Sequence, residues 1–366
     1  MEHPENDDLY KGLKVNKGVA DVPTVNPYLK KRIQRKEYTP AEFVEGILKG
    51  NITILSQAVT LVESSKYEHQ QVAQEIIEKC LPHAGKSVRI GITGVPGAGK
   101  STSIDAFGMH LIGQGRKLAV LAIDPSSERS KGSILGDKTR MEALSREKNA
   151  FIRPSPSAGS LGGVARKTRE TIVLCEAAGF DTVFVETVGV GQSETAVHSM
   201  VDFFLLIQLA GTGDELQGIK RGIMEMADGI IINKADGDNL EKAKLAAAQF
   251  RNALHLFPAP ESSWSPKVLT YSGYYNSGIK EIWDMVGEYM EFTQKNGYFN
   301  YKRNEQAKYW MYESINDTLR ETFYHNPAVE KMLNFTEQQV LNNEISSFVA
   351  AKRMMDLFLE NLSAKK

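Results

Sequence analysis

The feature that most constrains the fold of this chain is the segment GVPGAGKS. In it, Gly94 and Gly99 are separated by four residues and are followed directly by Lys100 and Ser101. This is the phosphate-loop pattern, in which glycines let backbone N–H groups wrap the phosphates, the lysine reaches the β- and γ-phosphates, and the serine hydroxyl binds Mg²⁺. A buried-strand pattern at residues 88–93 precedes the loop, and a helical pattern whose N-terminus favours an anion follows it. The segment therefore predicts a protein that binds a nucleoside triphosphate.

Short apolar runs alternate with longer helical segments across residues 87–279. This alternation predicts parallel β-α-β units and assigns these residues to one nucleotide-binding domain. The polar motifs described below follow the apolar runs, as a doubly wound sheet requires, because its ligand crevice lies at the carboxyl ends of the strands. We therefore expect an α/β fold with a doubly wound, mostly parallel sheet. The predicted strands are residues 88–93, 118–123, 182–186, 203–207, 230–233 and 268–271.

The chain before this domain divides into two parts. Residues 1–38 are polar and end in a basic run, which predicts a flexible N-terminal arm, with a basic docking segment as the alternative. Residues 39–86 predict a helical N-terminal extension. It begins with Thr39 as N-cap, Pro40 in the first turn and Glu42 in the third position of a capping box.

Residues 280–366 predict a helical C-terminal region. Thr336 opens a second capping box, so we expect the last helix to begin at about Glu337. Apolar residues at helical spacing follow it, and they have two interpretations: packing on the core of the chain itself, or a homodimer seam that covers a methionine-containing face. On the second interpretation the region is a dimerisation arm. The apolar residues are Leu341, Ile345, Phe348, Met355, Phe358 or Leu359, and Leu362.

Composition places the chain among soluble globular proteins. Its 366 residues carry a formal net charge of −1, which gives no reason to expect a nucleic-acid partner. Cys80 and Cys175 lack metal-ligand spacing and are expected to be buried thiols in a reducing compartment. The acidic N-terminus is unlike a secretory signal or a mitochondrial presequence, and no apolar run approaches membrane-spanning length. We expect a cytoplasmic protein with no membrane partner.

The base of the nucleotide is expected to be read by Asn233, Lys234 and Asp236, which follow a predicted strand. The Asp236 carboxylate can accept both the N1–H and the N2–H₂ groups of guanine, whereas adenine presents no matching pair of donors. Asn233 can bridge neighbouring loops, and the Lys234 stem can lie along the base. Ser272 and Gly273, after the last predicted strand, supply a backbone donor for the guanine carbonyl or form an ordinary turn. The predicted nucleotide-binding residues are Gly94, Val95, Pro96, Gly97, Ala98, Gly99, Lys100, Ser101, Thr102, Gly189, Asn233, Lys234, Asp236, Ser272 and Gly273.

Magnesium requires hard oxygen ligands and keeps several waters. Beside Ser101, the candidate ligands are Asp124 at the end of the second predicted strand, Asp137 in a predicted switch loop, and Glu186 at the end of the third. In the last motif an acid reaches Mg²⁺ through water, and the N–H of Gly189, three residues on, senses the γ-phosphate. Many GTPases carry Asp at the position of Glu186. Each acid could instead cap a helix.

The chain shows no segment like a kinase catalytic loop, so water is the expected phosphate acceptor and catalysis is positioning plus electrostatics. Gln192 and Lys220 could orient this water or neutralise charge, and the sequence does not choose between them. Residues 211–221 are expected to form a mobile loop near the nucleotide, or a helix N-terminus capped by Asp214. We expect slow intrinsic hydrolysis that a partner accelerates. The candidate catalytic residues are Lys100, Glu186, Gln192 and Lys220.

From about residue 39 to the C-terminus, the chain closely resembles the MeaB/ArgK family of P-loop GTPases, the G-protein chaperones of adenosylcobalamin-dependent methylmalonyl-CoA mutase. The resemblance implies a homodimer with a P-loop GTPase core and a C-terminal dimerisation arm. It also implies that Asp124, Asp137 and Glu186 serve the Mg²⁺ site and the switch loops. A third switch loop is implied to end at Lys220, a residue involved in activation of the GTPase by the mutase. The family gates cobalamin delivery and protects or rescues the mutase. The matching motifs are residues 91–102, 124–127, 136–141, 185–194 and 213–220.

Two other functions compete with this interpretation. A GTPase that inserts metal into another metalloenzyme usually has His-rich or Cys-His sites, and the seven histidines here are scattered. A GTP-dependent kinase would transfer phosphate to a small molecule or a protein. A partitioning-type ATPase is disfavoured, because such proteins carry an extra lysine early in the phosphate loop, where this chain has Val95 and Pro96.

Overall fold

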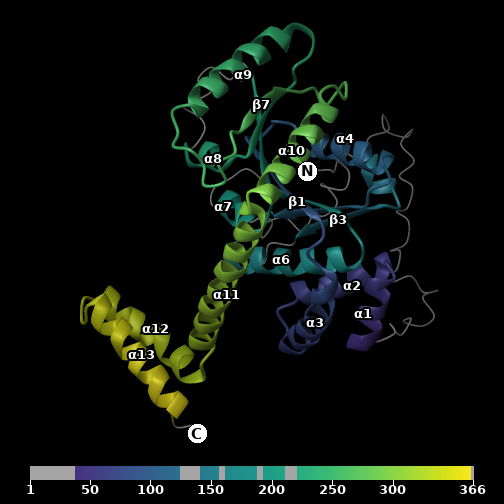
Figure 1. Cartoon of the computed structure of the whole chain (residues 1–366). Helices are drawn as coiled ribbons and strands as arrows, with labels where there is room; N and C mark the ends of the chain where they lie inside the picture. Colours follow the sequence, from purple (N-terminus) through teal and green to yellow (C-terminus); the bar gives the residue numbers. More distant parts are fainter. Residues whose placement is uncertain (1–37, 124–140, 156–160, 188–192, 211–220, 364–366) are drawn as a thin grey trace, which may run out of the picture. The chain divides into compact units, whose positions relative to one another are not determined.

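The centre of the computed structural model is a seven-stranded parallel sheet in the order β3-β2-β4-β1-β5-β6-β7 (Figure 1). The structure describes residues 38–123, 141–155, 161–187, 193–210 and 221–363. Because β1 lies between β4 and β5, the chain runs to both sides of it, and its carboxyl end is the switch point where ligands bind in such sheets. The strands are β1 (Val88–Gly94), β2 (Leu118–Ile123), β3 (Ala150–Ser155), β4 (Thr182–Thr187), β5 (Phe203–Leu209), β6 (Gly229–Asn233) and β7 (Lys267–Thr270).

Helices cover both faces of the sheet, which confirms the doubly wound α/β prediction. On one face Ile90 and Ile92 of β1 pack in a common core with α4 and α10. On the other face Leu206 of β5 packs with α8 and α9. Helix α7 packs directly on β1 at Gly91, where an added Cβ would come within 2.9 Å of Val197. The helices of this part are α4 (Lys100–Gly113), η5 (Leu144–Arg146), α6 (Leu161–Ala177), α7 (Ser193–His198), α8 (Arg221–Met226), η6 (Gly237–Asn239), α9 (Leu240–Leu254) and α10 (Ile279–Lys295).

In the described residues before β1, three helices pack near α6: α1 (Pro40–Leu48), α2 (Ile52–Glu63) and α3 (Tyr67–Cys80), with the short η3 (Leu81–His83) after them. Asn51 caps α2 by accepting hydrogen bonds from backbone N–H groups of its first turn. Glu63, at the end of α2, pairs with Arg153 of β3, and its carbonyl accepts a 2.8 Å hydrogen bond from Lys167 of α6. The helical extension predicted from Thr39 onward is therefore present and is attached to the sheet.

Three helices follow α10, namely α11 (Tyr298–Tyr324), α12 (Pro327–Leu341) and α13 (Ser347–Ser363) (Figure 1). The first half of α11 is bonded to the segment before β5. Arg303 pairs with Asp202 at 2.7 Å, and the indole N–H of Trp310 donates to the Ser199 carbonyl at 3.0 Å. The base of α11 is thus fixed to the amino end of the sheet, opposite the phosphate loop.

The predicted start of the last helix at Glu337 is wrong. Thr336 lies inside α12, and its hydroxyl donates back to the Met332 carbonyl rather than capping a helix. Helix α12 begins at Pro327, with Asn326 as the N-cap whose side chain accepts from the N–H of Ala328, and the last helix, α13, begins at Ser347. The predicted apolar stripe is consequently divided between the end of α12, the following turn and α13.

Strand β3 was not predicted. It holds Phe151 and Ile152 but also Pro154, which cannot donate to a sheet ladder. A proline is tolerated here because β3 is an edge strand. In the described part of the chain, no helix is long and apolar enough to cross a bilayer.

Candidate nucleotide site

The phosphate loop leaves β1 at its carboxyl end and enters α4, as predicted. Gly94 packs so closely on β5 that a Cβ would lie 2.2 Å from the Ile207 carbonyl oxygen. Gly99, the N-cap residue of α4, has a φ of +88°, and a Cβ there would lie 2.5 Å from the side-chain nitrogen of Asn233. Both positions therefore require glycine, and the loop backbone is held against the neighbouring strands β5 and β6.

Lys100 begins α4 and folds back over the loop. Its ammonium donates to the carbonyls of Gly94, at 2.8 Å, and Val95, at 3.4 Å. Burial lowers the pKa of Lys100, while the carboxylates of Glu186 and Glu194 act in the opposite direction. The lysine is thus placed at the loop, and two acidic side chains lie close enough to act on its charge.

Ser101 and Glu186 lie side by side, as a shared magnesium site requires. The Ser101 hydroxyl donates to Glu186 Oε1 at 3.3 Å. Glu186 is buried on β4 opposite Ile92 of β1, and the next residue, Thr187, donates its hydroxyl to Thr93 at 2.8 Å. A hydroxyl and a carboxylate are hard oxygen donors of the kind Mg²⁺ takes, so these two residues fit that ion.

Among the described residues, no three His, Cys, Asp or Glu side chains form a cluster that could hold a metal. Mg²⁺ needs no such cage, since it is usually bound by one or two protein groups together with phosphates and water. The Ser101–Glu186 pair fits a magnesium ion that takes its other ligands from phosphates and water.

Asn233, at the end of β6, joins three loops, as the sequence suggested. Its Nδ2 donates to the carbonyl of Ala98 in the phosphate loop at 2.8 Å. Its Oδ1 accepts from the N–H of Gly273 at 3.1 Å and from the N–H of Lys234 at 2.7 Å. Only 3% of Asn233 is exposed, so these bonds form away from solvent. The loops after β1, β6 and β7 are thereby held in one arrangement.

Asp236 lies beside the loop that follows β7. Its carboxylate accepts a hydrogen bond from the Ser272 hydroxyl. The backbone joins the same two loops, because Ala235 N–H donates to the Tyr271 carbonyl at 2.9 Å and Tyr271 N–H donates to the Ile232 carbonyl at 2.9 Å. The structure thus brings the predicted guanine-reading residues together at one edge of the sheet.

Several predicted site residues lie outside the described residues: Asp124, Asp137, Gly189, Gln192 and Lys220. Of the rest, Pro96 and Gly97 are exposed at the tip of the phosphate loop, and Thr102 is exposed in the first turn of α4. The sequence assigned no role to Glu194, which is buried in the first turn of α7 and whose charge acts on Lys100. The available signal was an acid just after the Glu186 motif, at the start of a helix.

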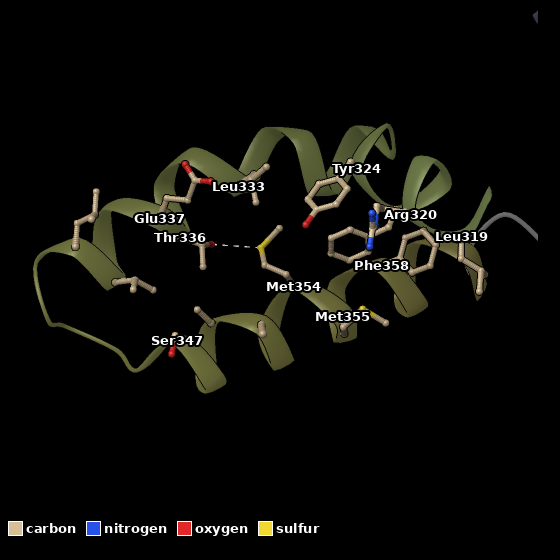
Figure 2. A pocket seen from close by; sticks show the side chains of 15 residues that line it. Leu319, Arg320, Tyr324, Leu333, Thr336, Glu337, Ser347, Met354, Met355 and Phe358 are labelled. Atoms are coloured by element: carbon tan, nitrogen blue, oxygen red, sulfur yellow. Dashed lines mark hydrogen bonds between the residues drawn. The ribbon is translucent and has the colours of Figure 1, made fainter. Parts of the chain in front are cut away.

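A second concave surface lies far along the chain, between α11, α12 and α13. Helices α12 and α13 form a hairpin, and Figure 2 shows Thr336, Met354 and Phe358 in the space between them. The Thr336 hydroxyl donates to the Met354 sulfur at 3.4 Å. The groove has a volume of about 740 Å³, and Leu319 and Met355 are among its apolar lining residues. It contains none of the nucleotide-site residues.

Comparisons with known proteins agree with this geometry. A family model described as methylmalonyl-CoA mutase-associated GTPase MeaB matches residues 55–328. The GTPase ArgK of Escherichia coli is 44% identical over 320 residues, which cover 87% of this chain and 97% of that protein. A Mus musculus protein named methylmalonic aciduria type A homolog, mitochondrial, is 45% identical and covers 86% of this chain and 78% of its own. A solved structure of a protein described as LAO/AO transport system kinase is 38% identical, with a TM-score of 0.69 over 88% of this chain and 99% of that one.

Proposed function

The chain belongs to the family of methylmalonyl-CoA mutase-associated GTPases described as MeaB, and from this premise we propose that its GTP cycle serves a cobalamin-dependent acyl-CoA mutase. In this proposal the protein is a chaperone that gates adenosylcobalamin loading and protects or reactivates the mutase. Methylmalonyl-CoA mutase is the client named in the family description. We place the cycle in the cytoplasm, without a nucleic-acid or membrane partner.

The observation that carries the nucleotide part of the proposal is the bridge made by Asn233. This one side chain joins the phosphate loop to the loop that leads to Asp236, which supports a single nucleotide with its phosphates at Lys100 and its base at Asp236. A carboxylate at the base position favours guanine over adenine. GTP and GDP are therefore the proposed ligands.

Magnesium is the proposed second cofactor. Ser101 and Glu186 support its site by their contact, and Asp124 and Asp137 are proposed to complete it from the segment that follows β2. When bound, the ion would neutralise charge on the phosphates. The protein groups hold the oxygen donors in place, and the Lys100 ammonium lies at the mouth of the same loop.

Hydrolysis in this proposal uses water as the acceptor, with Gln192 or Lys220 orienting the water or neutralising charge. Intrinsic turnover is slow and the client accelerates it. The runner-up activity is phosphate transfer to another acceptor, which comes into consideration because one structural relative is described as a kinase. Stoichiometric release of inorganic phosphate from labelled GTP separates the two, since a kinase would leave label on an acceptor.

We further propose that the protein is a homodimer that pairs through its C-terminal helices. Support comes from the apolar groove of Figure 2 and from a set of large apolar side chains that a single chain leaves exposed. Burying such side chains in a partner is favourable, and contiguous exposed apolar surface marks interaction sites. Exposed apolar side chains on these helices include Leu319, Leu341, Phe348, Val349 and Leu359.

Light scattering tests the dimer with a matched pair of variants. Phe348, on α13, is 86% exposed, and Leu256, after α9, is 83% exposed. Phe348→Glu is expected to shift the mass from two chains to one, whereas Leu256→Glu is expected to leave it unchanged. A wild-type protein with the mass of a single chain would contradict the dimer.

A pull-down from native lysate tests the client. The protein serves as the bait, loaded either with a GTP analogue or with GDP. The captured protein is then added to a GTPase assay. Capture of a cobalamin enzyme that accelerates hydrolysis supports the proposal. Failure to capture one in either nucleotide state overturns the client assignment and leaves the GTPase activity intact.

A further inference from the structure

Glu194 is a buried acid that the proposed GTP cycle does not use. It lies in the first turn of α7, and only 4% of it is exposed. Among the described residues, its Oε2 atom has no hydrogen-bond partner. A buried carboxylate oxygen without a donor is costly, and such groups in native proteins normally meet a partner, a water or an ion. The structure therefore leaves a donor to be supplied at this atom.

The surroundings of Glu194 locate the missing donor at the phosphate loop. Helix α7 packs against β1 and β4, the two strands that end in the phosphate loop and in Glu186. Val197 of α7 lies so close to β1 that a Cβ on Gly91 would come within 2.9 Å of it. Burial lowers the pKa of Lys100, and the carboxylates of Glu186 and Glu194 oppose that shift. Glu194 and Glu186 thus approach the same lysine from α7 and from β4.

The protein donors nearby, in the part of the chain that the structure describes, do not bond to Glu194 Oε2. The Lys100 ammonium uses two of its three N–H groups on the carbonyls of Gly94 and Val95. It makes no hydrogen bond to Glu194 Oε2, and the Ser101 hydroxyl donates to Glu186. The nucleotide itself is a poor candidate, because its phosphates are anionic and would repel a carboxylate. A group that carries positive charge or is polarised by a cation is required.

We infer that Glu194 is a further residue of the magnesium site, whose Oε2 atom accepts a hydrogen bond from a water molecule bound to the nucleotide-associated Mg²⁺. This inference rests on the proposed guanine-nucleotide and magnesium site and deepens it. Mg²⁺ gives up its waters reluctantly, so residues that hold those waters act as an outer shell around the ion. Glu194 would thereby tie the start of α7 to the bound ion.

The experiment measures how strongly GDP binding depends on free Mg²⁺, with a fluorescent GDP analogue titrated at a series of magnesium concentrations. GDP cannot be hydrolysed further, so the readout is independent of catalysis. Glu194→Gln keeps the size of the side chain and removes its charge. Since loss of an outer-shell partner typically costs 10- to 100-fold in metal affinity, we expect the magnesium midpoint to rise by about 10-fold or more. Affinity measured in EDTA should stay near the wild-type value.

Glu170→Gln is the matched control. Glu170 is a partly buried acid on α6 that pairs with Arg166 at 3.1 Å and takes no part in the nucleotide site. It should leave the magnesium midpoint unchanged. Glu194→Asp keeps the charge but shortens the reach, and it should give a midpoint between those of the wild type and Glu194→Gln. Thermal melting confirms that each variant is folded.

The outcomes separate the inference from the proposed function. An unchanged midpoint in folded Glu194→Gln overturns the inference. If hydrolysis alone falls in that case, Glu194 acts on the attacking water instead. If the wild type does not bind guanine nucleotides, this result overturns the proposed function itself, whatever the Glu194 variants show. If it binds them without any dependence on Mg²⁺, the proposed magnesium site fails, and the inference fails with it.

Discussion

The side-chain amide of Asn233 donates a 2.8 Å hydrogen bond to the carbonyl of Ala98, and so joins the end of β6 to the phosphate loop. The same side chain accepts from the backbone of Gly273 after β7. Three loops that are far apart in sequence depend on one buried residue. The phosphate loop and the loops after β6 and β7 are therefore structurally coupled.

Asn233→Ala is expected to weaken GDP binding by about 10-fold or more, because an unpaired buried polar group costs roughly 1–3 kcal/mol and the variant takes the partner from three backbone groups. The free energy of unfolding should fall as well. Equilibrium titration with a fluorescent GDP analogue and urea unfolding measure the two effects. Asn252→Ala, on the exposed side of α9, is the control and should change neither. Wild-type affinity in Asn233→Ala would show that the loops hold their positions without this bridge.

Asp236→Asn is expected to change the base that the site accepts. The carboxylate presents two acceptors to guanine, whereas an amide presents one acceptor and one donor, which matches the N1–H and C2 carbonyl of xanthine. Losing a hydrogen bond to a charged group costs about 1.5–3 kcal/mol, so GTP affinity should fall roughly 10- to 100-fold. Competition binding with GTP and XTP measures the change. Equal loss of both nucleotides would mean that Asp236 serves the Ser272 contact rather than the base.

Arg303→Gln is expected to lower the free energy of unfolding by about 3 kcal/mol. The guanidinium makes two hydrogen bonds, of 2.8 and 2.7 Å, to the buried Asp202 carboxylate, and removal of one partner leaves that charge uncompensated. Urea unfolding provides the measurement. Lys308→Gln, which breaks an exposed pair with Glu305 on the same helix, should have no measurable effect. Similar stabilities for the two variants would refute a structural role for the α11 attachment.

Stability is expected to fall as the pH drops below about 6.5, in part because of His198. Burial, together with the nearby Lys302 ammonium, lowers the pKa of His198 to about 3. The unfolded chain therefore takes up a proton at this ring that the folded protein does not, and the folded state loses roughly 2 kcal/mol by pH 5. Urea unfolding between pH 5 and 8 tests this against His198→Gln, which should depend less on pH. Identical pH dependence in both proteins would exclude His198 as the cause.

Local sequence patterns were sufficient to predict most of the fold. The phosphate loop and strand β1 are adjacent in sequence, and the strands that form the sheet interior are nearly continuous apolar runs. The bridging role of Asn233 followed from its place after such a strand. Its contacts confirm that expectation.

The features that the sequence did not predict depend on distant contacts or on competing local signals. Strand β3 contains a proline that only its edge position tolerates. Thr336 matches a capping box, but Asn326 and the proline after it begin the helix earlier. Arg303 contacts Asp202 across about a hundred residues, and no local pattern reports such a pair. Glu194 was overlooked because its isolation becomes visible only when its burial is known.

The rate of inorganic phosphate release from GTP, with and without a purified adenosylcobalamin-dependent methylmalonyl-CoA mutase, tests the proposed GTP cycle most directly. We predict slow release from the protein alone, a marked acceleration by the mutase, and no label transferred to any acceptor. The control reaction contains ATP in place of GTP and should release no phosphate. Fast release without the mutase, or a rate that the mutase leaves unchanged, would contradict a GTP cycle that serves this enzyme.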